Sequence, residues 1–204
     1  MIHLNPACQI KDLKICSLNT IHEEGIAKIN TISKLVLRKR GDSAVEFYNA
    51  ANRLYVLHFI EVANMGSHRV LYFMLRLADG KRGGAPDKEM GRMVVAVITQ
   101  YLEEHPDELV CYCHPDHYKA YAADRIFHLW ARSNMDILGS RATYFDGVGH
   151  DAEGHGLHFM VMHHRACQDI DKLKAYILEN SDEFATSVRE QLDLLHDIEE
   201  KLHE

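Results

Sequence analysis

The sequence reads Leu54-Tyr-Val-Leu-His-Phe-Ile-Glu-Val62 and then, after a turn at Asn64-Met-Gly-Ser67, Val70-Leu-Tyr-Phe-Met-Leu-Arg-Leu77, and this stretch decides the fold class. Both runs are rich in β-branched and aromatic residues, which favour strands. The short turn between them predicts a long antiparallel hairpin. Because the runs are almost continuously apolar, we expect the sheet to be covered on both faces.

The residues before this hairpin predict further strands. The period of the apolar residues changes to two from about residue 34, which predicts a strand over 34–38 and a second one over 45–48, with a turn at Gly41-Asp42 between them. Residues 21–31 are expected to form a short helix. The sheet therefore begins before the long hairpin and continues through it.

The residues after the hairpin alternate between helices and strands. Asp87 follows a break rich in glycine and proline, and it is expected to cap a helix to Glu104 whose apolar residues recur three or four apart. The remaining expected elements are a strand over 109–113, a helix over 117–132, strands over 142–145 and 157–164 around a Gly- and His-rich loop at 146–156, and helices from 169 that restart near Asn180.

Length and charge suggest one domain with an acidic extension. A chain of 204 residues fits one domain, and we divide it into an N-terminal helical segment (1–33), an α/β body (34–168) and C-terminal helices (169–204). The C-terminal part holds eleven acidic and four basic residues, which accounts for the whole net charge of −7. Nucleic acid is an unlikely partner of the acidic tail, and of the chain as a whole, although the neutral body could hold a local basic patch at Arg38-Lys39-Arg40. The segment 181–204 is instead expected to bind a protein partner or a second copy through a stripe at Val188, Leu192, Leu195 and Leu202.

The remaining composition bounds the compartment. Five cysteines without a regular framework argue against a secreted disulfide scaffold. The first residues do not have the pattern of a signal peptide, and no apolar run is long enough for a membrane span. We therefore expect a cytoplasmic protein without a membrane partner.

The order of elements, together with the turn Lys81-Arg-Gly-Gly-Ala85, resembles the GCN5-related N-acetyltransferase (GNAT) superfamily over about residues 34–165. This resemblance implies an α/β (α+β) fold with a mixed, mainly antiparallel sheet flanked by helices. It also implies that Arg82, Gly83, Gly84 and Ala85 hold the pyrophosphate of acyl-coenzyme A at a helix N-terminus, where free amides and the helix dipole favour an anion. A solvent-exposed turn is the alternative, because the spacing from Arg82 to the glycines is too short for the family pattern, Pro86 lacks an amide donor and Asp87 brings negative charge.

The same resemblance suggests catalytic positions. His58 and Glu61 lie on the strand where such enzymes often place a general base for an amine substrate. Aligning Ala123 with the family pattern puts Phe127 where a tyrosine usually protonates the departing thiolate, and phenylalanine cannot donate a proton. Either Tyr121, earlier on the same helix, or another group does this work, or the fold is kept without the chemistry.

A second resemblance is to an uncharacterised bacterial family of unknown function, over about residues 43–165. It is carried by the start of the long hairpin, by Cys111-Tyr-Cys-His-Pro-Asp116 and by Arg125-Ile-Phe-His-Leu-Trp130, and it implies no activity. The sequence thus supports two hypotheses. The first is an N-acyltransferase-like protein that uses acyl-coenzyme A as a co-substrate and a small amine as acceptor. The second is a non-enzymatic interaction module on the same fold.

Cysteines and histidines raise the question of a metal site. Cys113, His114 and His117 could supply three zinc ligands, but Cys111 and Cys113 have a Cys-x-Cys spacing and share one face of a strand, which favours buried core thiols. We therefore expect no metal there. A second group, at positions 150, 155, 158, 163 and 164, could include a catalytic base, although odd spacing puts His158 and His163 on opposite faces of their strand.

Overall fold

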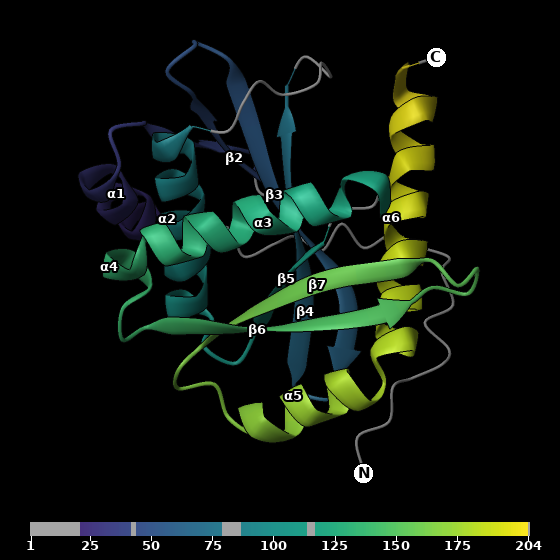
Figure 1. The fold of residues 1–204 in the computed structure, drawn as a ribbon. Helices are drawn as coiled ribbons and strands as arrows, with labels where there is room; N and C mark the ends of the chain where they lie inside the picture. The colour runs from purple at the N-terminus through teal and green to yellow at the C-terminus, as the bar shows by residue number, and fades with distance from the viewer. Residues whose placement is uncertain (1–20, 42–43, 79–86, 114–116, 204) are drawn as a thin grey trace.

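The computed structural model describes residues 21–41, 44–78, 87–113 and 117–203, with the side chains of 117–124 and 194–203 outside the description. Within these ranges the chain forms one sheet of seven strands in the order β1-β2-β3-β4-β5-β7-β6 (Figure 1). The strands are β1 (Leu37–Arg40), β2 (Ala44–Tyr48), β3 (Leu54–Met65), β4 (His68–Leu77), β5 (Leu109–Cys113), β6 (Ala142–His150) and β7 (Gly156–His164).

The sheet is mixed but mainly antiparallel, as predicted. Every neighbouring pair runs antiparallel except β4 and β5. The long hairpin is confirmed: β3 and β4 pair from Tyr55–Leu77 to Met65–His68, with a bulge between Glu61 and Ala63. The carbonyl of Val62, the extra residue in this bulge, accepts a hydrogen bond of 2.9 Å from Ser187 Oγ. Ser187, far away in the sequence, therefore supplies a hydrogen bond to a backbone carbonyl that the bulge leaves out of the β3–β4 ladder.

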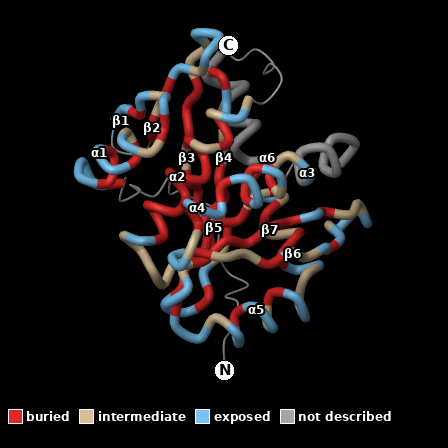
Figure 2. Tube along the Cα trace, turned by 60° about the vertical axis from the view of Figure 1, so that its left-hand side comes forward, coloured by how far each residue is buried: buried red, intermediate tan, exposed pale blue. Residues whose placement is uncertain are grey.

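Helices cover both faces of the sheet, and the predicted burial of both faces is confirmed. The helices are α1 (Glu23–Ile32), α2 (Lys88–Glu104), α3 (His117–Ser133), α4 (Met135–Leu138), α5 (Ile170–Glu179) and α6 (Ser181–His203). Apolar side chains of α1 to α4 pack in one core cluster with Leu57, Phe59 and Phe73 of the sheet. Those of α5 and α6 form a second cluster on the opposite face, with Ile60 and Val161. Figure 2 shows buried residues concentrated along the strands.

Helix α2 forms where its cap and its apolar spacing predict it. The Asp87 side chain accepts a hydrogen bond of 2.6 Å from the Met90 amide, which satisfies one of the free donors of the first turn. Twelve of its residues are buried, because the helix packs against the sheet and against α1, α3 and α4. At Gly91 a β-carbon would lie 2.2 Å from the Trp130 ring, so the small residue lets α2 and α3 approach closely.

Two local predictions were wrong, and one short helix was missed. The first strand lies at Leu37–Arg40 rather than 34–38, because the Asn30 side chain holds both the amide and the carbonyl of Leu37. Residues 146–150 continue β6 instead of forming a loop. The turn occupies only residues 151–155, between β6 and β7, where Asp151 Oδ1 accepts hydrogen bonds from the amides of Glu153 and His155. The short helix α4 was not expected.

The C-terminal helices restart where the sequence indicated, at Asn180 between α5 and α6. The proposed partner stripe, however, is partly wrong. Val188 is 0% exposed and Leu192 is 7% exposed, and both pack in the second core cluster of this chain. They are therefore not available to a partner, while the side chains of Leu195 and Leu202 lie outside the described residues. Among the described helices, none has the length and apolar character needed to cross a bilayer.

Candidate functional site

Among the described strands, the single parallel pair is short and ends early. It joins three residue pairs, Val70–Leu109, Leu71–Val110 and Tyr72–Cys111. Beyond them β4 continues to Leu77 beside β3, while β5 continues to Cys113 beside β7. The next described elements after these two strands are α2 and α3, which lie on the same face of the sheet. Open sheets with parallel strands commonly bind ligands at such ends.

Aromatic side chains pack where β4 and β5 part. On one face the Tyr72 hydroxyl donates a hydrogen bond of 3.2 Å to the Cys113 carbonyl, and burial raises the pKa of Tyr72 well above its usual value. On the other face the rings of Tyr112 and Phe127 stack with centroids 3.5 Å apart. Phe73 packs against both of these rings. Phe127, at the position that the family resemblance assigns to a proton donor, is thus a buried core residue.

Several predicted site residues lie outside the described residues. These are the turn residues Arg82, Gly83, Gly84 and Ala85, and the side chain of Tyr121. The helix that follows the turn is described, and the Asp87 carboxylate already occupies its Met90 amide. An anion bound at this N-terminus would therefore have to use other donors beside a negatively charged cap.

The predicted bases His58 and Glu61 lie on opposite faces of the sheet. His58 shares a face with Ile60 of the second core cluster, whereas Glu61 shares a face with Phe59 of the first cluster. Glu61 Oε2 lies 3.8 Å from Arg69 Nη1, and the Arg69 guanidinium also binds Glu108. Burial is the largest single effect on the pKa of Arg69 and lowers it, but the hydrogen bond and charge of Glu108, together with Tyr101 and Glu61, raise it overall. The structure therefore does not bring His58 and Glu61 together, and it places Glu61 in an ion-pair network.

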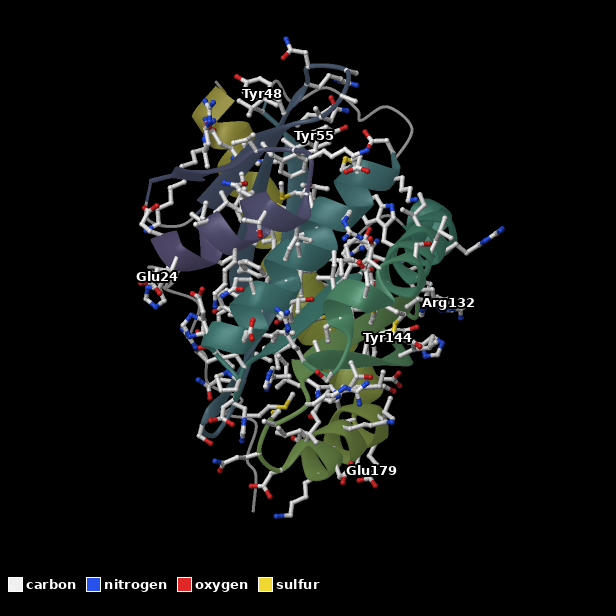
Figure 3. The ribbon with its side chains drawn as sticks, turned by 90° about the vertical axis from the view of Figure 1, so that its left-hand side faces the viewer. Glu24, Tyr48, Tyr55, Arg132, Tyr144 and Glu179 are labelled. Carbon is white, nitrogen blue, oxygen red and sulfur yellow. The ribbon has the colours of Figure 1, made fainter. Side chains whose placement is uncertain are left out.

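A pocket that the sequence did not indicate lies between α3 and the β6–β7 hairpin. It has a volume of about 340 Å³ and is lined by His128, Arg132, Asp146, Gly147, Val148, His158 and Phe159. His128 Nε2 lies 3.2 Å from Asp146 Oδ1, and the His128 ring packs edge-on against Tyr144. Figure 3 shows Arg132 of α3 and Tyr144 of β6 on the same side of the molecule.

The strand register places this pocket at the level of the end of β5. Cys113, the last residue of β5, pairs with Phe159 of β7, and Phe159 pairs with Gly147 of β6. The next pair along the hairpin, Val148 and His158, borders the pocket. A histidine held by a carboxylate can take a proton from a nucleophile, and Arg132 adds a positive charge. The pocket therefore combines a histidine–carboxylate pair with a positively charged side chain, a lining that suits a small polar ligand.

The histidines near the hairpin do not form one site. His158 borders the pocket, whereas His163 is 8% exposed on the opposite face, as the odd spacing predicted. His150 lies beside Asp182 of α6, and His155 lies beside Asp151 and Glu153 in the hairpin turn. The pKa of His163 is lowered: burial is the largest cause and Arg165 and Lys174 add to it, while the hydrogen bond to the His164 carbonyl and the charge of Asp171 oppose it.

The lowered pKa of His163 predicts a pH effect on stability. Its pKa in the folded state lies below its value in the unfolded chain, so the unfolded chain takes up more protons as the pH falls through the unfolded value of about 6.5. From about pH 8 to about pH 5, wild type should therefore lose more free energy of unfolding than His163→Gln. Urea denaturation at several pH values measures this difference. Equal losses in both proteins would contradict it.

Buried thiols account for the described cysteines. A hydrogen bond that the Cys111 thiol gives to Cys113, together with burial, raises the pKa of Cys111 well above its usual value, and both residues belong to the second core cluster. Their shared face and burial agree with the interpretation as core thiols, while His114 and the His117 side chain lie outside the described residues. Cys167 lies elsewhere, after β7, and burial with the nearby Asp107 and Asp169 raises its pKa to about 11.

The fold and the pocket define the chain as an α+β protein with a seven-stranded mixed sheet and a polar pocket beside α3. No family model matches the chain. A search of curated proteins finds no match either.

Proposed function

We propose that this protein binds an acyl-coenzyme A thioester and transfers the acyl group to a small amine. The observation that carries the proposal is the sheet order β1-β2-β3-β4-β5-β7-β6, with its one parallel pair parting after three residue pairs. The proposal rests on the resemblance of this arrangement, and of the turn at 81–85, to N-acetyltransferases of the GNAT superfamily.

Physical considerations support a nucleotide-bearing ligand at this place. The two strands of the only parallel pair in the described sheet are each followed in the chain by a helix on the same face. Helix N-termini and glycine-rich turns present amides that favour phosphate groups. In the proposal, Arg82 contributes charge and the amides of Gly83, Gly84 and Ala85 bind the pyrophosphate.

The pocket between α3 and the β6–β7 hairpin is the proposed acceptor site. In the reaction the amine nitrogen attacks the thioester carbonyl, the C–N bond forms, and the C–S bond breaks. The proposed base is His128, which lines this pocket and whose Nε2 lies 3.2 Å from Asp146 Oδ1; it takes the proton that the amine loses. His58 and Glu61, one on each face of the sheet, are the alternative bases. The coenzyme A thiolate takes up a proton as it leaves, with Tyr121 as its proposed donor.

Two observations favour the alternative, a non-enzymatic interaction module on the same fold. At the position where the family has a proton donor, this chain has Phe127, whose ring is stacked in the core. The N-terminus of α2, where the pyrophosphate would bind, is already capped by the Asp87 carboxylate. In this alternative the chain binds a protein partner through the acidic C-terminal region beyond Leu192. The two functions differ in whether the chain binds acyl-coenzyme A.

We expect acetyl-coenzyme A to raise the melting temperature of the protein. At a ligand concentration a hundredfold above Kd, binding adds about 2.7 kcal/mol to the free energy of unfolding. For a chain of this length this corresponds to a rise of about 5–10 °C. Differential scanning fluorimetry with acetyl-coenzyme A, coenzyme A and 3′-phospho-ADP measures the effect and shows which part of the ligand is bound.

A matched pair of variants ties the effect to the proposed turn. Arg82→Glu should abolish most of the shift, whereas Arg38→Glu, at an exposed position of β1, should keep it. No shift in wild type would contradict binding and favour the interaction module. A shift without release of free thiol in the presence of small amines would support binding and contradict acyl transfer.

A further inference from the structure

Three segments far apart in the sequence meet at the end of the sheet where the central strands β4 and β5 begin. His68 opens β4, Asp107 lies just before β5, and Cys167 follows β7. An imidazole nitrogen of His68, a carboxylate oxygen of Asp107 and the Cys167 sulfur all lie within 4.8 Å of one another. The parallel register explains the first two, because Val70 pairs with Leu109 and each residue lies two positions before its member of that pair.

Hydrogen bonds hold this cluster in place. The His68 Nδ1 lies 2.8 Å from the Asp107 carbonyl. Because a carbonyl oxygen only accepts, Nδ1 carries the proton and Nε2 of the neutral ring is left as an acceptor. The Asp107 carboxylate accepts from the Gln168 amide at 3.2 Å, which ties it to the segment that carries Cys167. Metal-binding histidines usually have such a hydrogen bond on their other nitrogen.

The surroundings suit a cation of intermediate softness. His68 is 7% and Cys167 is 5% exposed, so the cluster sits at the margin of the core. Asp169, two residues after Cys167, carries a second carboxylate, and its Oδ1 lies 2.5 Å from Lys172 Nζ. Nitrogen, oxygen and sulfur donors together are typical of zinc sites.

We propose that His68, Asp107 and Cys167 form a three-ligand Zn²⁺ site that fastens the start of β4, the α2–β5 connection and the β7–α5 connection to one another. Zinc–donor distances of about 2.0–2.3 Å place tetrahedral donors about 3.5 Å apart, which side-chain rotation can reach from the present separation. The fourth position is left to water. The site lies at the amino ends of β4 and β5, so it is separate from the proposed acyl-coenzyme A site and does not depend on it.

Cobalt spectroscopy of the metal-free full-length protein tests the proposal. Co²⁺ binds in place of Zn²⁺ at zinc sites, and a cobalt–thiolate bond gives a charge-transfer band in the near ultraviolet. We expect one equivalent of Co²⁺ to produce this band and Zn²⁺ to displace it. We also expect Zn²⁺ to raise the melting temperature, since the unfolded chain holds no preformed site.

Variants decide whether these three residues are the ligands. Cys167→Ser should lose the band, whereas Cys113→Ser, at another buried thiol, should keep it. His68→Asn and Asp107→Asn should weaken Zn²⁺ binding by at least about a hundredfold, the upper end for loss of an outer-shell partner. Absence of the band in wild type would overturn the proposal. So would a band that persists in Cys167→Ser, or Zn²⁺ affinity that His68→Asn leaves unchanged.

Discussion

Removal of residues 181–204 is expected to unfold the protein rather than only to change its oligomeric state. The described part of α6 contributes four buried side chains to the second core cluster, Phe184, Ala185, Val188 and Leu192. Burial of each of the three larger ones contributes about 1.5–3 kcal/mol, and their sum is comparable with a total stability of about 5–15 kcal/mol. The truncated chain should lose its cooperative thermal transition, as measured by circular dichroism.

Two controls separate core loss from loss of charge. A chain ending at Asp193 keeps the four buried residues and should still melt cooperatively. In the full chain, Val188→Asp places a charge at a position that is 0% exposed and should cost at least about 3 kcal/mol, while Glu190→Ala at an exposed position should be nearly neutral. A cooperative transition at the wild-type temperature in the chain lacking 181–204 would contradict the expectation.

Local patterns were enough to predict most of the sheet and helices. The hairpin of β3 and β4 follows from β-branched and aromatic runs around a turn, and α2 follows from Asp87 and the spacing of its apolar residues. The error at 146–150 has a physical origin. Glycine is intrinsically unfavourable in a strand, so the local sequence predicts a loop. Gly149 is nevertheless required in β6, because α6, which is distant in the sequence, packs directly against it.

The candidate sites depended on contacts that no local pattern contains. His128 and Asp146 belong to different elements and meet only because α3 lies over the β6–β7 hairpin. The cluster of His68, Asp107 and Cys167 requires the strand order to be known. By contrast, the separation of His58 and Glu61 could have been predicted, because the odd spacing that separates His158 from His163 applies equally to them.

Replacement of Gly149 by alanine should destabilise the protein strongly, although it adds only one methyl group. A β-carbon at this position would lie 2.0 Å from the Ser181 carbonyl oxygen and 2.4 Å from its carbon, which are backbone atoms at the start of α6. Since no side-chain rotation can relieve this overlap, the helix itself must move. We expect a loss of about 3 kcal/mol, the upper end of the range for overpacking, measured by urea denaturation.

Gly156→Ala is the matched control in the same hairpin, because a β-carbon there meets no atom within 4 Å. Its free energy of unfolding should stay within about 0.5 kcal/mol of wild type. If both variants were equally stable, α6 would not rest on β6 as described. If only Gly149→Ala is destabilised, Gly149 is a point of contact between β6 and α6 rather than part of a loop. The acidic C-terminal helix is then a structural part of the α+β body.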